Sequence, residues 1–74
     1  MPYILIQVTR EGGPEGRGPS RAEKAELIAG TTRLLQEVLG KDPAATMVVI
    51  DEVELDNWGI GGLPVPEFRR RSKG

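Results

Sequence analysis

The chain has 74 residues, a formal net charge of −1, and neither cysteine nor histidine. The absence of cysteine excludes disulfides, and the absence of both residues disfavours a zinc or copper site. The balanced charge lacks the broad positive field of a general nucleic-acid binder. The sequence shows no signal-peptide pattern and no apolar stretch near the roughly twenty residues that cross a membrane. We therefore expect a soluble cytoplasmic protein that binds neither nucleic acid nor membrane.

The length limits the stability of the chain on its own. We expect one small domain that spans residues 1–74. A chain of this size buries only about 60–65% of its unfolded surface, so its own core is marginal. Small folds usually add disulfides, a metal or oligomerisation, and this composition favours oligomerisation.

The first regular element predicted along the chain is a strand at residues 3–9 (YILIQVT). Its residues are largely β-branched or apolar, and Ile4, Ile6 and Val8 share one face. Residues 10–19 (REGGPEGRGP) then form a loop rich in glycine and proline. This loop is long for a connection in so small a domain, which indicates either a function or a tolerated insertion.

A helix of about 19 residues is predicted next, and it begins after Ser20. Ser20 and Glu23 have the spacing of a capping box, in which the serine oxygen accepts from the Glu23 N–H and the glutamate reaches back. Gly40 fits the left-handed position that ends a helix. Apolar residues recur between these ends at helical spacing: Leu27, Ile28, Leu34, Leu35, Val38 and Leu39.

Residues 46–53 (TMVVIDEV) predict a second strand. Its centre, residues 47–50, is continuously apolar, which is typical of a strand buried on both faces. A strand, a helix and a strand make a βαβ unit, so we predict an α/β fold in which the two strands are parallel. Their crossover should be right-handed.

The C-terminal part carries turn and edge signals. The glycines of residues 58–62 (WGIGG) indicate a tight turn or short hairpin, and the prolines of residues 63–66 (LPVP) indicate an edge rather than a central strand. The chain then ends in a basic tail that contains residues 69–71 (RRR) and Lys73. Exposure to solvent or a contact between subunits is favoured for this tail over contact with nucleic acid.

This fold leaves a sheet face uncovered. A two-stranded parallel sheet with one helix has one open face and unpaired edges, and such sheets need both faces covered. Leu5, Met47 and Val49 need packing partners that the chain cannot supply. We therefore expect an obligate oligomer whose sheets join edge to edge or face to face.

Pro2 is the candidate catalytic residue, because a small second residue favours removal of the initiator methionine. Removal would give Pro2 a free secondary amine, which can accept and donate protons as a peptide-bonded proline cannot. The absence of histidine and cysteine increases the weight of this group, since those residues are the usual proton shuttles and nucleophiles.

Three features together resemble the 4-oxalocrotonate tautomerase family: Pro2 opening a strand, the S-x-x-E-K helix start at residues 20–24, and the aromatic-Gly-Ile-Gly-Gly turn at Trp58. The resemblance implies a βαβ protomer assembled as a hexamer, a trimer of dimers. It also implies a free N-terminal proline that acts as general base without a metal or organic cofactor. Arginines would bind the substrate carboxylate, and Trp58 would form a wall of the pocket.

The arginines are where this chain departs from the family pattern. The arginine of the loop after the first strand has two candidates here, Arg10 at the end of the strand and Arg17 within the loop, and solvent exposure is the alternative for each. Counting back from Trp58 places Met47 where the family has its second arginine. The second carboxylate contact is then missing or comes from elsewhere, such as the tail, which puts a dicarboxylate substrate in doubt.

Elementary electrostatics supports a base at Pro2. An α-amino group titrates near ~8, and a base works best when its pKa is near the operating pH. One arginine about 6 Å away disfavours the ammonium by roughly 3 kcal/mol at an effective dielectric near 20, which is about 2 pKa units. Burial against Trp58 acts in the same direction.

We therefore predict a cofactor-independent keto–enol tautomerase of small 2-oxo acids or their dienol forms. Pro2 is the predicted base, Trp58 the pocket wall, and Arg10 or Arg17 the charge stabiliser. One alternative is a hydratase, dehalogenase or decarboxylase of small acids that uses protonated Pro2 as an acid. Another is a non-catalytic oligomeric module.

Overall fold

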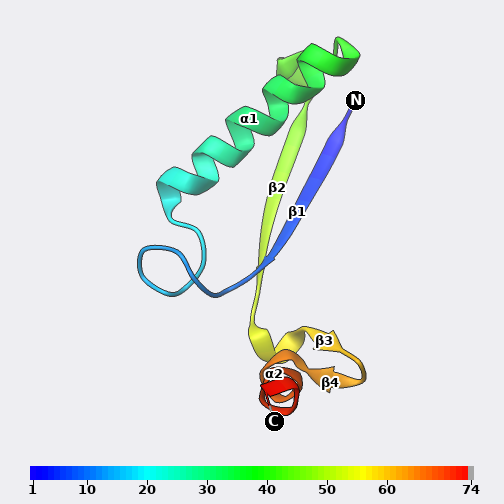
Figure 1. The fold of residues 1–74 in the computed structure, drawn as a ribbon. Coiled ribbons are helices and arrows are strands. Elements are labelled where there is room, and N and C mark those ends of the chain that lie inside the picture. Colours follow the sequence, from blue (N-terminus) through cyan, green and yellow to red (C-terminus); the bar gives the residue numbers. More distant parts are fainter. Residues whose placement is uncertain (74) are drawn as a thin grey trace.

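A computed structural model describes residues 1–73, in which a βαβ unit carries a C-terminal arm (Figure 1). Strand β1 (Tyr3–Thr9) pairs in parallel with β2 (Met47–Val53), with Tyr3 opposite Met47 and Thr9 opposite Val53. The predicted parallel pair is confirmed. Strand β2 begins one residue later than predicted, because the N–H of Thr46 donates to the short helix η1 (Pro43–Ala45).

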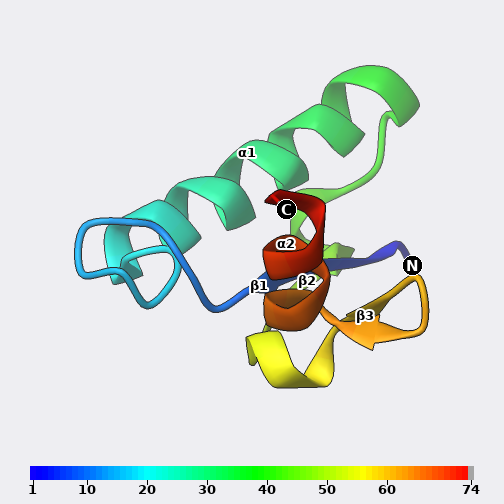
Figure 2. The ribbon, with the colours of Figure 1, turned by 60° about the horizontal axis from the view of Figure 1, so that its bottom comes forward.

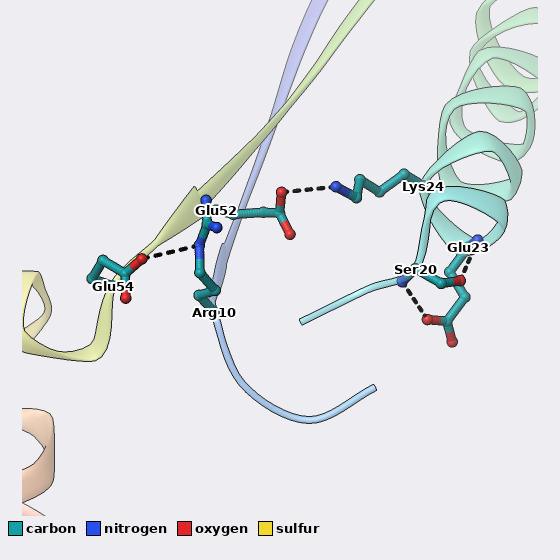
Figure 3. Close-up of polar contacts among 6 residues, drawn as sticks. All are labelled: Arg10, Ser20, Glu23, Lys24, Glu52 and Glu54. Carbon is teal, nitrogen blue, oxygen red and sulfur yellow. Dashed lines mark hydrogen bonds and ion pairs between the residues drawn. The ribbon is translucent and has the colours of Figure 1, made fainter. Parts of the chain in front are cut away.

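Helix α1 (Arg21–Leu39) has 19 residues and both of the predicted end signals. The Ser20 hydroxyl oxygen accepts from the Glu23 N–H at 3.1 Å, and the Glu23 carboxylate accepts from the Ser20 N–H at 2.8 Å (Figure 3). Gly40 ends the helix at φ 66°, and its N–H donates to the Gln36 carbonyl at 2.9 Å. These local signals fix where the crossover helix starts and stops.

Helix α1 covers one face of the sheet and leaves the other open. Side chains alternate along β1, so Ile4, Ile6 and Val8 are half-buried while Leu5 on the opposite face is 46% exposed. The same alternation leaves Met47 and Val49 exposed on β2, and most apolar side chains of α1 are exposed as well. In residues 1–73 the one buried apolar side chain is Val65, which is 7% exposed.

The glycine-rich loop between β1 and α1 is held by its own backbone. The Gly16 N–H donates to the Gly13 carbonyl at 3.3 Å, and the Gly18 N–H donates to the Gly12 carbonyl at 3.0 Å. Gly18 is buried, and a Cβ on it would lie 3.2 Å from a carboxylate oxygen of Glu52 on β2. The loop therefore contacts the sheet at Gly18, while residues 12–17 are exposed.

The C-terminal arm comprises η2 (Leu55–Asn57), the hairpin of β3 (Gly59–Ile60) and β4 (Leu63–Pro64), and helix α2 (Val65–Lys73). The predicted hairpin is confirmed, and its two turn glycines both have positive φ, 61° and 82°.

The sequence predicted an edge at residues 63–66 followed by a basic tail, and no helix; β4 ends at residue 64, and residues 65–73 form the helix α2 instead. Pro66 lies in the first turn, where a missing N–H costs nothing. Glu67 pairs with Arg70 and Arg71 one turn later, which supports the helix from its own surface. The Val65 N–H donates to the Trp58 carbonyl at 2.9 Å and ties α2 to the hairpin.

The protomer is elongated. Its extents are 48 × 26 × 17 Å and its radius of gyration is 15.7 Å. A compact chain of 74 residues would have a radius of gyration of about 11 Å. The C-terminal arm lies beyond the carboxyl ends of the two strands, and α2 is viewed nearly end-on in Figure 1 and from the side in Figure 2. Within residues 1–73, no helix combines the length and the apolar character that crossing a bilayer requires.

Candidate functional site

Pro2 lies immediately before β1, at the end of the sheet that is remote from the C-terminal arm (Figure 1). Its ring is half-buried, and its carbonyl accepts from the Met47 N–H at 3.0 Å. Met1, which acylates the proline nitrogen, is 87% exposed. Loss of Met1 would therefore remove almost no packing and would leave the proline anchored through its carbonyl.

Pro2 and Trp58 of the same chain do not meet. The parallel register places Met47 beside the start of β1, so Trp58 follows the other end of β2. Each residue of a strand advances the chain by about 3.3 Å, so the seven-residue strands separate the two ends by about 20 Å. Figure 1 shows the N-terminus and the hairpin at opposite ends of the protomer. A site that uses both residues requires two copies of the chain.

Trp58 lines a hollow of about 320 Å³ between the end of β1 and the C-terminal arm. Its side chain is 36% exposed, and its backbone is fixed by hydrogen bonds to Leu55 and Val65. We call this space the Trp58 hollow. It is lined by Thr9, Glu11, Trp58, Ile60, Val65, Phe68 and Arg69. An apolar hollow of this size with a few polar groups suits a small ligand.

The two charged side chains of the Trp58 hollow pair with each other. Arg69 donates two hydrogen bonds to the Glu11 carboxylate, at 2.7 and 3.0 Å, and the Thr9 hydroxyl also donates to this carboxylate. The bonds from Arg69 and Thr9 favour the ionised form and lower the pKa of Glu11 to about 2. The Glu11–Arg69 pair therefore stays ionised at any pH near neutrality.

Arg10 lies at the same end of the sheet as Trp58, and its guanidinium already forms an ion pair. Its Nε is 3.2 Å from a Glu54 carboxylate oxygen, and it also lies near Glu52 (Figure 3). Glu52 in turn accepts from the Lys24 ammonium at 2.8 Å, and this bond lowers the pKa of the Glu52 carboxyl. These contacts tie β1, β2 and α1 together at the base of the loop.

Arg17 lies on the loop between β1 and α1 and is exposed. Within residues 1–73 it has no ion-pair partner. Arg10 and Trp58 thus lie beyond the end of the sheet opposite Pro2, and Arg17 lies on the loop that leaves β1 at that end. Met47, which the count back from Trp58 aligned with the family's second arginine, lies at the Pro2 end and is 49% exposed.

A second, larger hollow of about 590 Å³ opens between β1, the loop and the start of α1. Its wall includes three carboxylates, those of Glu11, Glu23 and Glu26, and no lysine or arginine. This charge repels an anionic ligand. The Trp58 hollow has one carboxylate, which Arg69 neutralises, so it repels an anionic substrate less than the larger hollow does.

Comparison with known proteins fits this geometry. A family model described as tautomerase enzyme matches residues 2–67. This chain belongs to the tautomerase family. The resemblance predicted from Pro2, the helix start and the aromatic-glycine turn is confirmed, and the chain is a tautomerase, an isomerase.

Similar proteins extend over nearly the whole chain. Probable tautomerase K2 of Dickeya dadantii (strain 3937) is 49% identical over 72 residues, which cover 97% of this chain and 98% of that protein. The crystal structure of DmpI from Helicobacter pylori is 39% identical, with a TM-score of 0.79 over 93% of this chain and 97% of that one. A heterohexameric 4-oxalocrotonate tautomerase from Chloroflexus aurantiacus is 25% identical, with a TM-score of 0.73, and covers 93% and 100% of the two chains.

Two residues of the Trp58 hollow, Glu11 and Arg69, were not singled out by sequence reasoning, which named only the basic tail as a possible source of the second carboxylate contact. They are 58 positions apart, and neither lies in a motif. The charge spacing in residues 65–73 was the useful signal: Glu67 precedes Arg70 and Arg71 by three and four residues, which is typical of a helix. A helix predicted there would have indicated that the basic tail is ordered and can line a pocket.

Proposed function

We propose that this tautomerase interconverts the keto and enol or dienol forms of small 2-oxo acids, with a free Pro2 as general base. The base removes a proton from a carbon next to the carbonyl and returns it at another carbon, so atoms and electrons balance within one substrate. The observation that carries the proposal is the setting of Pro2, whose carbonyl is anchored to Met47 and whose nitrogen bears only the exposed Met1.

We propose further that the active site forms between copies, in a hexamer built as a trimer of dimers. The separation of Pro2 from Trp58 within one chain supports a shared site, because Trp58 can wall only another copy's proline. The open sheet face at Leu5 and Val49 supports assembly. The heterohexameric architecture of the related Chloroflexus aurantiacus enzyme is consistent with it.

Arg17 is the stronger candidate for stabilising the enolate-like charge and binding the carboxylate. Arg10 already pairs with Glu54, whereas Arg17 is exposed and unpaired within residues 1–73. A cation and an aromatic wall brought to Pro2 by another copy would lower the pKa of its amine toward neutrality. The same groups would then serve both the base and the intermediate.

The test is a matched set of N-terminal forms assayed with phenylenolpyruvate, each verified by intact mass. The form that starts at Pro2 should be active, and a form with an uncleaved N-terminal extension should be inactive. The same extension placed at the C-terminus is the control. Pro2→Ala retains a primary amine, so its kcat/KM should fall by less than the roughly 10²–10⁴-fold that a positioned base contributes.

Full activity in the N-terminally extended form would contradict the proposal. The pH profile separates the two roles of the proline, because kcat/KM rises through the Pro2 pKa for a base and falls through it for an acid. A falling profile would assign the chain to the acid-catalysed alternative. Inactivity of the verified Pro2 form with every enol tested would favour the non-catalytic module.

A further inference from the structure

The wall of the Trp58 hollow is apolar and carries no net charge. Trp58, Ile60, Val65 and Phe68 supply its apolar surface, and Ile60 is 46% exposed. Its charged groups, one carboxylate and one guanidinium, cancel. A ligand group that enters this hollow is therefore favoured if it is uncharged and apolar.

Glu11 already occupies the guanidinium of Arg69. The pair is bidentate, which is the strongest geometry available to an arginine and a carboxylate. Glu11 belongs to the same chain, so its carboxylate has a high effective concentration at Arg69, whereas a ligand carboxylate competes only at its concentration in solution. Because the pKa of Glu11 is lowered to about 2, protonation does not free Arg69 near neutral pH.

Other cations close to this end do not replace Arg69. Arg10 pairs with Glu54, while Arg70 and Arg71 both pair with Glu67 on the surface of α2. Arg17 has no ion pair within residues 1–73, but it does not line the hollow, and the proposed function assigns it to the first carboxylate. A second carboxylate at the far end of a substrate would therefore enter the hollow without a free partner among the lining residues and would lose its hydration.

Resting on the proposed function, we propose that Glu11 sets the charge preference of the site by neutralising Arg69. The substrates are then 2-oxo acids with one carboxylate and an uncharged, apolar far end, such as an aryl or alkyl group. Glu11 acts here through Arg69 and is a positioning residue.

Glu11→Gln tests the proposal, because it removes the competing charge and keeps the size of the side chain. The two substrates are phenylenolpyruvate, with one carboxylate, and 2-hydroxymuconate, with two. In the native enzyme kcat/KM should favour phenylenolpyruvate. The variant should shift the ratio by roughly tenfold toward 2-hydroxymuconate, mainly through KM, since one charge-assisted contact becomes available.

Three further variants separate the effect of the Glu11 charge on substrate preference from a structural effect of the substitution. Glu11→Asp retains the charge and should retain the native preference. Glu11→Gln combined with Arg69→Gln should lose the gain, because the freed guanidinium is gone. Glu67 lies on the same helix and pairs with Arg70 and Arg71 rather than with Arg69, so Glu67→Gln should leave the ratio unchanged.

Binding gives a readout independent of turnover, since Trp58 is the one tryptophan of the chain and its fluorescence reports on the hollow. The native protein should bind 3-phenylpropionate more tightly than adipate, and Glu11→Gln should bind adipate roughly tenfold more tightly than native. An unchanged adipate affinity, or equal losses for both ligands, overturns this inference and leaves the proposed function standing. Loss of activity in the native Pro2 form would sink the proposed function alone, since the fluorescence titration still decides the role of Glu11.

Discussion

Glu52 connects three elements at the base of the loop. It lies on β2 and accepts from Lys24 on α1 at 2.8 Å (Figure 3). A carboxylate oxygen of Glu52 also lies close to the buried Gly18 of the loop. Arg10 adds its charge from the end of β1. The carboxylate is the common partner of two cations, which explains why its pKa is lowered.

The Lys24–Glu52 ion pair predicts a specific loss of stability in acid. The pKa of Glu52 is lowered in the folded protein from its ordinary 4.5, so its contribution is fully present above pH 4.5 and is lost as pH falls through the lower folded value. A double-mutant cycle of Lys24→Met and Glu52→Gln, measured by urea unfolding at fixed protomer concentration, should show a coupling at neutral pH that becomes smaller at about pH 3. Coupling that is the same at both pH values would contradict this account.

At the scale of elements, the loop between β1 and α1 depends on one close backbone contact. Gly13 has φ 73°, and a Cβ on it would lie 2.0 Å from the Gly18 carbonyl oxygen. Gly16 has the same φ of 73°, but a Cβ there would have no neighbour within 4 Å. The two glycines therefore separate the cost of a left-handed backbone from the cost of a steric clash.

Gly16→Ala should destabilise the protein by about 1 kcal/mol, the usual cost of placing a side chain in left-handed backbone. Gly13→Ala should cost roughly 2–4 kcal/mol, because the loop must also open to relieve the overlap. Urea unfolding followed by Trp58 fluorescence, at matched protomer concentrations, measures both. Equal losses in the two variants would show that the Gly13–Gly18 contact is not maintained in solution.

The elements that were predicted correctly from the sequence are those whose own residues carry the pattern that defines them. The alternation around Ile4 and Ile6 defines β1, and Ser20 with Gly40 bounds α1. Helix α2 was missed because Pro66 resembles a breaker, while its packing depends on Val65 and the hairpin. In the candidate site, Pro2 and Trp58 stand out by residue type. The Glu11–Arg69 pair does not, since only the folded arm brings its two members together.

At the scale of the whole molecule, the protomer lacks a core of its own. Val65 is its one buried apolar side chain within residues 1–73, and the radius of gyration of 15.7 Å exceeds that of a compact chain. Leu5, Met47 and Val49 present half-exposed apolar surface on the face opposite α1. Burial of that face against other copies is what we expect to stabilise the fold, so assembly and folding should be inseparable.

Leu5→Glu should therefore abolish assembly and folding together. A carboxylate on the open face would be buried without a partner, at an effective cost of several kcal/mol per copy, which exceeds what a marginal protomer can absorb. Sedimentation velocity should show loss of the oligomer, and far-ultraviolet circular dichroism should show loss of helix in the same samples. Leu5→Met, which keeps an apolar side chain of similar volume, should retain both. A Leu5→Glu protein that remained a folded monomer would show instead that the βαβ unit and its arm are stable alone, and that the open face is not needed for folding.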